Sequence, residues 1–317
     1  MNIRRLLKAM QDATILYVMP WLPSRLPWTW AYACYRFCAR FRFVFDEPAE
    51  AAGAVAPGYL PIANVEAFKR DVRTVWLLDA VDFHLSRRRP VEWMPDHIEI
   101  EGQWPDGAFV ATGFHYGTGL WIFRALRRSG RDSMLVSARL DRQEYRERPV
   151  LYRYVAARFD EVARIARLPV AFRPRIRERL QKALAQGACV VSVMDMPPRM
   201  APRGQRPVRW LDRDASLPDG SLALARDAGV PIVPWWVEID LETGRRKLVI
   251  GKALAPEPVD EAVQELAASL DSLIRKQPAA WLFWNEWINW QRDAAQFSSA
   301  RVEGTLSASA SAQERTS

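Results

Sequence analysis

Short apolar runs that alternate with helical stretches constrain the fold of this sequence more than any other feature. Residues 108–112, 134–138 and 188–194 are apolar runs of strand length, and a polar or glycine-containing segment follows each of them. Helical patterns fill the intervals between these runs, as in the crossover connections of parallel strands. The sequence therefore predicts an α/β fold in which helices flank a mostly parallel central sheet.

The same pattern continues on both sides of this unit. Asn64 precedes an amphipathic helical pattern that extends to residue 88. Further along the chain, Pro174 is expected to begin a helix that Gly187 ends. We also predict strands at 230–239 and 248–250 and helices at 221–228 and 257–276.

The first 63 residues have the pattern of a membrane-surface segment. Within Met1–Gln11, apolar residues (Ile3, Leu6, Leu7, Met10) share one side of a helix and basic residues (Arg4, Arg5, Lys8) the other. Tryptophans suited to the interface follow, at Trp21, Trp28 and Trp30. Prolines interrupt the apolar stretch before it reaches the length of about 20 residues that a membrane-spanning helix needs. We predict a helical region over 1–63 that lies on the membrane, with neither a spanning helix nor a cleaved signal; a helical layer over the core is the alternative.

The rest of the chain divides into one domain and a tail. Residues 64–296 are predicted to form a single α/β domain, because strands and helices alternate throughout without an internal repeat. Residues 297–317 are mostly small and polar, with little to bury, and we expect a disordered tail there.

The basic residues are concentrated in the middle of the chain. The net charge is +8, and the segment from Arg124 to Arg179 holds 16 Arg, no Lys and 7 acidic residues. Arginine favours planar contacts to phosphate, which occurs in lipid headgroups, in coenzyme A and in the phosphopantetheine arm of acyl carriers. A solvated helical face is the alternative for most of these arginines. No nucleic-acid-binding signature is present, so we predict no nucleic-acid partner.

Cysteine and histidine are too sparse for a metal site. Cys34 and Cys38 share a helical face, but no second pair of ligands follows, and Cys189, His84 and His97 are isolated. We therefore predict neither a metal nor a cofactor. The low cysteine content fits a reducing, cytoplasmic-side location.

His115 is the strongest candidate for a catalytic residue. It directly follows a predicted buried strand and precedes a helix, which is where open α/β sheets present ligand-binding groups. Gly113, Gly117 and Gly119 surround it, and glycine allows the backbone and a substrate to approach closely.

Residues 114–117, Phe-His-Tyr-Gly, resemble the His-Phe-Gly segment of the lauroyl and myristoyl acyltransferases of lipid A (lipopolysaccharide) biosynthesis, within the lysophospholipid acyltransferase superfamily. Further blocks resemble the family's Pro-Asp-Gln, Phe-Phe-Gly, glycine-rich, Gly-Ala-Pro-Val-Val-Pro and Trp-rich segments in the same order, at 193–196, 208–211, 218–225, 229–234 and 278–290. The resemblance covers about residues 64 to 290. It implies that His115 acts as general base on an acceptor hydroxyl that attacks an acyl thioester.

One position departs from the family. The family has Asp or Glu five residues after the histidine, where this chain has Leu120. Leucine cannot orient an imidazole or stabilise an imidazolium, so an active enzyme needs another acid. Asp195 is our candidate, because it also follows a predicted buried strand and would share the sheet edge with His115; Asp141 and Glu144 are weaker candidates.

We expect the substrate-binding residues around this edge. Arg139 follows the strand at 134–138, and Arg153 and Arg158 lie on the next helical segment, so all three are candidate partners of phosphate. Gly117 and Thr118 are candidate substrate contacts, and the backbone amides from Gly117 to Gly119 are candidate donors to an oxyanion.

The resemblance implies an acyltransferase at the cytoplasmic face of the inner membrane. It would move a fatty or related acyl group from an acyl carrier protein or acyl-CoA thioester to a hydroxyl or amine of a membrane lipid or glycolipid. Because Leu120 breaks the family's motif, the alternative is a non-catalytic relative that binds lipid or an acyl carrier. That alternative predicts no carboxylate within hydrogen-bond reach of the imidazole.

Overall fold

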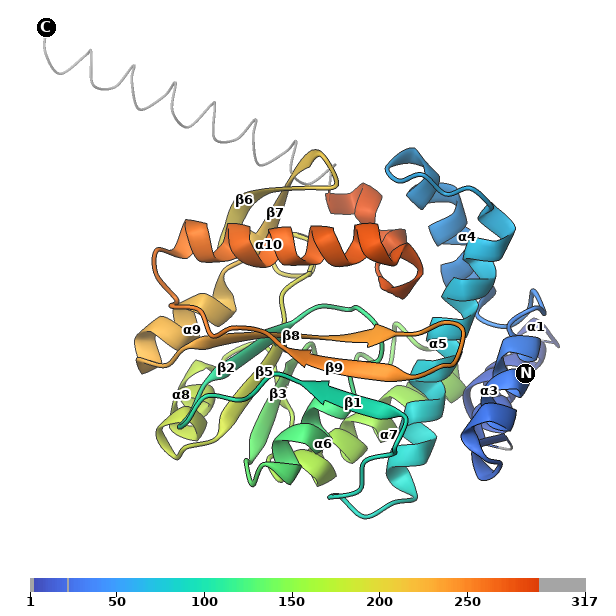
Figure 1. Ribbon diagram of the computed structural model, residues 1–317, viewed down its shortest axis with the longest axis horizontal. Helices are drawn as coiled ribbons and strands as arrows, with labels where there is room; N and C mark the ends of the chain where they lie inside the picture. The colour runs from blue at the N-terminus through green and yellow to red at the C-terminus, as the bar shows by residue number, and fades with distance from the viewer. Residues whose placement is uncertain (1–2, 22, 291–317) are drawn as a thin grey trace, which may run out of the picture.

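A seven-stranded sheet with the order β1-β9-β8-β2-β5-β3-β4 forms the centre of the protein in the computed structural model, which describes residues 3–21 and 23–290 (Figure 1). Strands β8, β2, β5, β3 and β4 run parallel to one another, whereas β9 pairs antiparallel with β8 and β1 runs parallel to β9. The fold is therefore the α/β fold with a mostly parallel sheet that the alternating pattern predicts. The predicted tail at 297–317 lies outside the described residues.

Most strands lie where the apolar runs predict them. The sheet consists of β1 (Ile98–Glu101), β2 (Val110–Gly113), β3 (Ser133–Ser137), β4 (Ala171–Phe172), β5 (Cys189–Val193), β8 (Ile232–Ile239) and β9 (Arg246–Ile250). A separate antiparallel hairpin, β6 (Gln205–Trp210) and β7 (Arg213–Pro218), packs against α10.

The helices of the α/β domain are α5 (Val65–Arg87), α6 (Trp121–Arg128), α7 (Pro149–Ala166), α8 (Arg177–Ala185), α9 (Gly220–Ala228) and α10 (Val259–Lys276). The side chain of Asn64 caps α5 by accepting a hydrogen bond from the Ala67 amide at 2.9 Å. The predicted start of α8 at Pro174 is wrong. Arg175 has a φ of +64°, which is not helical, and the helix begins only at Arg177.

Side chains of the central strands alternate between two helical layers. Val110 and Val190 face the core shared with α8, α9 and α10, whereas Ala111 and Val191 face the core shared with α6 and α7. Both faces of the central strands are therefore covered, which is why these strands read as continuous apolar runs.

The amino-terminal residues form a helical layer beside α5 (Figure 1). It comprises α1 (Ile3–Ala13), a π-helix (Thr14–Val18), α2 (Met19–Trp21), α3 (Trp28–Cys38), α4 (Asp46–Val55) and two 3-10 turns (Pro23–Arg25 and Ala56–Gly58). The predicted apolar side of α1 is exposed, with Ile3 72% and Leu7 61% accessible. Among the described residues, no helix combines the length and hydropathy needed to cross a bilayer.

Candidate functional site

Two neighbouring parallel strands bring His115 and Asp195 to the same edge of the sheet. β2 and β5 are paired in register, with Gly113 opposite Val193, and each candidate residue lies two positions beyond its strand. β8 runs toward α5 in Figure 1 and β2 runs parallel to it, so this edge faces the side of the molecule that carries the amino-terminal helices. The sequence analysis expects the two residues to lie together for this reason, because neighbouring parallel strands end at the same edge of a sheet.

The two side chains are hydrogen-bonded. His115 Nδ1 lies 2.9 Å from Asp195 Oδ1, and the His115 amide donates to both carboxylate oxygens at 2.9 Å. The Asp195 side chain is fully buried, whereas 27% of the His115 side chain is exposed. An ionised carboxylate only accepts hydrogen bonds, so the pair requires the proton on Nδ1 and leaves the Nε2 lone pair free.

The carboxyl-terminal segment completes the site with two aromatic residues that the sequence analysis did not single out. Trp281 Nε1 donates to Asp195 Oδ2 at 3.0 Å, which fixes the carboxylate from its other side. The Phe283 ring stacks on the imidazole at 3.9 Å between centroids and 14° between planes. Together they restrict the rotation of both members of the pair.

Backbone hydrogen bonds hold this segment against the loop that carries His115. The Leu282 amide donates to the His115 carbonyl at 2.8 Å, and the Gly117 amide donates to the Ala280 carbonyl at 2.8 Å. The expected role of the Gly117 amide as an oxyanion donor is therefore wrong for this conformation, because the amide already has a partner. Gly117 has a φ of +67°, and a side chain there would clash with the Val237 carbonyl.

Thr118 and Leu120 are both buried. The Thr118 hydroxyl has no hydrogen-bond partner among the described residues, so it is free to accept or donate. Leu120 packs in the apolar core with Ala111 and Val191, under α6 and α7. An acid at position 120 would therefore occupy an apolar environment, whereas the histidine has its acid from the neighbouring strand.

The three candidate arginines have different surroundings. Arg158 is engaged by Asp79, with nitrogen-to-oxygen distances of 2.6 and 3.0 Å, and so its role is to join α7 to α5. Arg153 is exposed on α7. Arg139 is exposed just beyond the end of β3, two strands from β2 on the same sheet edge, as expected.

Arg139 lines an apolar cavity of about 720 Å³ between the sheet and helices α8 and α9. Four further arginines line it, Arg173, Arg175, Arg177 and Arg203. Arg177 pairs with Asp227, whereas the other four arginines of the lining form no salt bridge with a described residue. Val110, Val190 and Leu224 form apolar walls, and the hydroxyls of Ser192 and Ser221 lie 2.8 Å apart at its lining. The cavity therefore combines an apolar interior with unpaired positive charge.

A second cavity, of about 460 Å³, lies between the amino-terminal helices and the Phe283 loop. Lys8 and Gln11 of α1 line it on one side, and Phe283 lines it on the other. It thus extends from the helix with the exposed apolar face to the ring that stacks on His115.

No group of three or more histidine, cysteine, aspartate or glutamate side chains suited to a metal ion is present in the part of the chain that the structure describes. No protein-family model matches the chain, and no curated protein matches it.

Proposed function

We propose that this protein is an acyltransferase in which His115 is the general base and Asp195 orients it. The observation that carries the proposal is the hydrogen-bonded pair itself, a partly exposed imidazole held at 2.9 Å by a fully buried carboxylate at the edge of a parallel sheet. The pair has the arrangement that general base catalysis requires, with one ring nitrogen held and the other free.

In the proposed reaction, His115 Nε2 takes the proton from the acceptor's hydroxyl or amine as that group attacks the carbonyl carbon of an acyl thioester. A new ester or amide bond forms, the carbon–sulfur bond breaks, and the imidazolium returns its proton to the leaving thiolate. Asp195 keeps the ring in the reactive tautomer and stabilises the imidazolium while it exists. Trp281 and Phe283 act as positioning residues.

Two cavities support separate sites for donor and acceptor, although neither is lined by His115 or Asp195 itself. The arginine-lined cavity beside Arg139 suits a donor that carries a phosphate, as acyl-CoA and acyl carrier protein both do. The cavity between α1 and Phe283 suits a lipid acceptor, because apolar side chains such as Leu16, Leu151 and Phe283 line it. The exposed apolar side chains of α1 lie outside this lining and would face the membrane surface. We propose that the protein acts on a membrane lipid or glycolipid, with lipid A as one candidate acceptor, at the cytoplasmic face of the inner membrane.

The non-catalytic alternative has less support. It expects no carboxylate near the imidazole, whereas Asp195 lies within hydrogen-bond distance. A histidine held by a buried carboxylate, with its other ring nitrogen unbonded, favours chemistry over binding alone.

The test uses the purified full-length protein with vesicles of mixed bacterial lipids and a panel of acyl-CoA and acyl carrier protein thioesters. We expect acyl-chain transfer to a lipid, detected as a mass increase of that lipid, and loss of transfer in His115→Ala at an unchanged unfolding temperature. A folded His115→Ala protein that transfers acyl chains at the normal rate would refute the proposal.

A further inference from the structure

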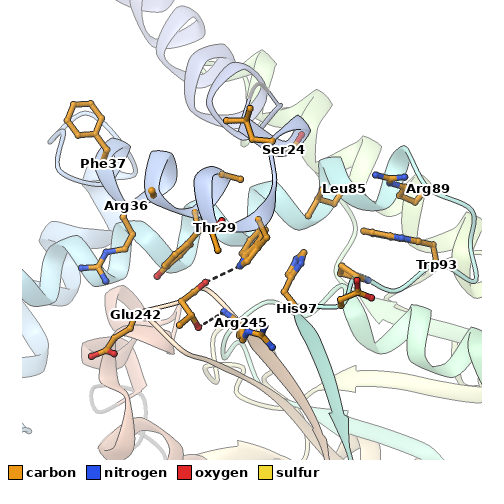
Figure 2. A pocket seen from close by; sticks show the side chains of 18 of the residues that line it. Ser24, Thr29, Arg36, Phe37, Leu85, Arg89, Trp93, His97, Glu242 and Arg245 are labelled. Atoms are coloured by element: carbon orange, nitrogen blue, oxygen red, sulfur yellow. Dashed lines mark hydrogen bonds between the residues drawn. The ribbon is translucent and has the colours of Figure 1, made fainter.

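A groove of about 1,230 Å³ lies between the amino-terminal helical layer and the loops at one end of β1, β8 and β9 (Figure 2). It is apart from the His115 site, and none of the pair's residues lines it. The α3 helix forms one wall, and His97 and Arg245 project from the opposite side. The proposed acyl transfer gives this groove no role.

Aromatic contacts make the centre of the groove rigid. The Trp28 ring stacks on His97 at 3.8 Å with planes 8° apart, and Trp28 Nε1 donates to the Thr243 carbonyl at 3.0 Å. The buried His97 Nε2 has no hydrogen-bond partner among the described residues. The groove is therefore a formed site with an unused polar atom in its wall.

Positive charge predominates along the groove. Four arginines line it, Arg36, Arg40, Arg89 and Arg245, against two acids, Asp96 and Glu242. None of the four guanidinium groups forms a salt bridge with a described residue, although the two acids lie in the same groove. Arg36 donates to the Leu241 carbonyl at 2.6 Å and Arg89 lies over the Trp93 ring, so neither of these charges is neutralised by a carboxylate. Arg36 and Arg89 lie toward opposite ends of it in Figure 2, with Arg245 between them. Unpaired guanidinium groups bind phosphate oxygens through planar, charge-assisted hydrogen bonds.

Exposed apolar side chains form part of the same groove. Leu26 and Phe37 line it and are 48% and 56% accessible, and Trp30 on the same helix as Phe37 is 70% accessible. An isolated phosphate-binding site would have no use for these side chains. A ligand that joins an anionic headgroup to hydrocarbon chains satisfies both features at once.

We propose that this groove binds the phosphate-bearing headgroup of an anionic membrane lipid, with the hydrocarbon chains directed along Leu26 and Phe37. The site is independent of the acyl-transfer proposal, because it contains none of the residues that hold His115. It would set the orientation of the amino-terminal layer on an anionic membrane surface.

The first experiment measures binding of a short-chain lipid that stays monomeric, dihexanoyl phosphatidic acid, to the full-length protein by calorimetry and by tryptophan fluorescence. We expect saturable binding of one lipid per protein, and at least about tenfold weaker binding of dihexanoyl phosphatidylcholine. Inorganic phosphate alone should bind at least about tenfold more weakly than the anionic lipid, because it lacks the hydrocarbon chains.

The double variant Arg89→Ala/Arg245→Ala is expected to bind the anionic lipid at least about tenfold more weakly than the native protein, because each substitution removes a charge-assisted hydrogen bond to the phosphate. Arg128→Ala/Arg209→Ala is the matched control, because it also removes two exposed arginines but none from the groove. Equal binding of both phospholipids, equal binding of phosphate alone, or equal losses in the two double variants would each overturn the proposal.

The same measurement in His115→Ala separates this site from the catalytic proposal. Lipid binding should be unchanged in that variant. Loss of lipid binding in His115→Ala would contradict the independence of the groove. Loss of acyl transfer in His115→Ala with intact lipid binding would agree with both proposals.

Discussion

Replacing the carboxylate of Asp195 by an amide tests the proposed mechanism most directly. Asp195→Asn preserves the size of the side chain, but an amide has one accepting oxygen where the carboxylate has two. In the native protein one carboxylate oxygen accepts a hydrogen bond from His115 Nδ1 and the other accepts one from Trp281 Nε1. The backbone amide of His115 donates to both oxygens at 2.9 Å. The single amide oxygen of the asparagine can therefore accept from either His115 Nδ1 or Trp281 Nε1, but not from both.

The size of the effect follows from which side the amide oxygen takes. If it faces His115, the hydrogen bond to Nδ1 remains but its acceptor is no longer charged, which lowers its strength by about 1.5 kcal/mol, or roughly 10-fold in rate. If it faces Trp281, the amide nitrogen meets Nδ1 and forces the proton to Nε2, which removes the base. The corresponding change in the Ser-His-Asp template costs about 10⁴ in turnover. We therefore expect kcat to fall between about 10-fold and about 10⁴-fold.

The assay follows release of the free thiol from an acyl thioester in the presence of acceptor vesicles. Nitrogen-15 NMR of the imidazole reports the tautomer, and a purely structural role for Asp195 would leave that signal unchanged. Asp141→Asn is the matched control, because Asp141 is exposed and distant in sequence from the pair. A folded Asp195→Asn protein with a rate within twofold of the native one would refute the reasoning.

Three further changes give expected outcomes. Leu120→Asp should lower the free energy of unfolding by about 2–5 kcal/mol in chemical denaturation, because position 120 lies in an apolar core. The same change should not restore activity to the Asp195→Asn variant in the thiol-release assay, and restored activity in the double variant would contradict this account. Asp82→Ala should cost about 3–5 kcal/mol in denaturation, because it leaves the fully buried Arg246 without its carboxylate; a loss below 1 kcal/mol would contradict it. Burial, and to a lesser extent the charge of Arg245, lower the pKa of His97 to about 4, so the neutral imidazole stabilises the fold fully above pH 6.5. As the pH falls from 6.5 toward 4, the free energy of unfolding should decrease by about 3 kcal/mol. The His97→Gln variant should lose less stability than the native protein over that range in chemical denaturation, and identical pH profiles would contradict this expectation.

The sequence predicts the sheet well where strands are buried on both faces. β2, β5 and β8 are mostly apolar, so their positions follow from composition and length. The pairing of His115 with Asp195 follows in turn, because parallel neighbours end at one edge. The antiparallel direction of β9 does not follow, since an apolar run carries no sign of its direction.

Other parts of the site depend on contacts that no local pattern encodes. The hairpin β6–β7 mixes charged and apolar residues and contains two prolines, Pro207 and Pro218, which obscures it as a strand pair. Trp281 and Phe283 lie in an irregular segment after α10, where no periodicity indicates which side chains turn inward. The tryptophan-rich composition of that segment was the one available signal.

Part of the arginine excess also has a structural purpose that charge counts alone do not reveal. Arg124 is fully buried and donates to the carbonyls of Ser86, Pro90 and Trp93, so it ties α6 to the end of α5 and the loop that follows. Arg158 is likewise engaged by Asp79. Arg139, Arg173, Arg175 and Arg203, in contrast, have no carboxylate partners among the described residues.

The aromatic support of the histidine comes from near the end of the described chain, and this has a consequence for how the protein matures. During synthesis the strands that carry His115 and Asp195 leave the ribosome well before Trp281 and Phe283. Until those last aromatic side chains emerge, the carboxylate lacks its indole donor and the imidazole lacks its stacking ring. A nascent or truncated chain that lacks Trp281 and Phe283 therefore holds the His115–Asp195 pair without these two contacts, and the proposed site is complete only once the final stretch of polypeptide has folded.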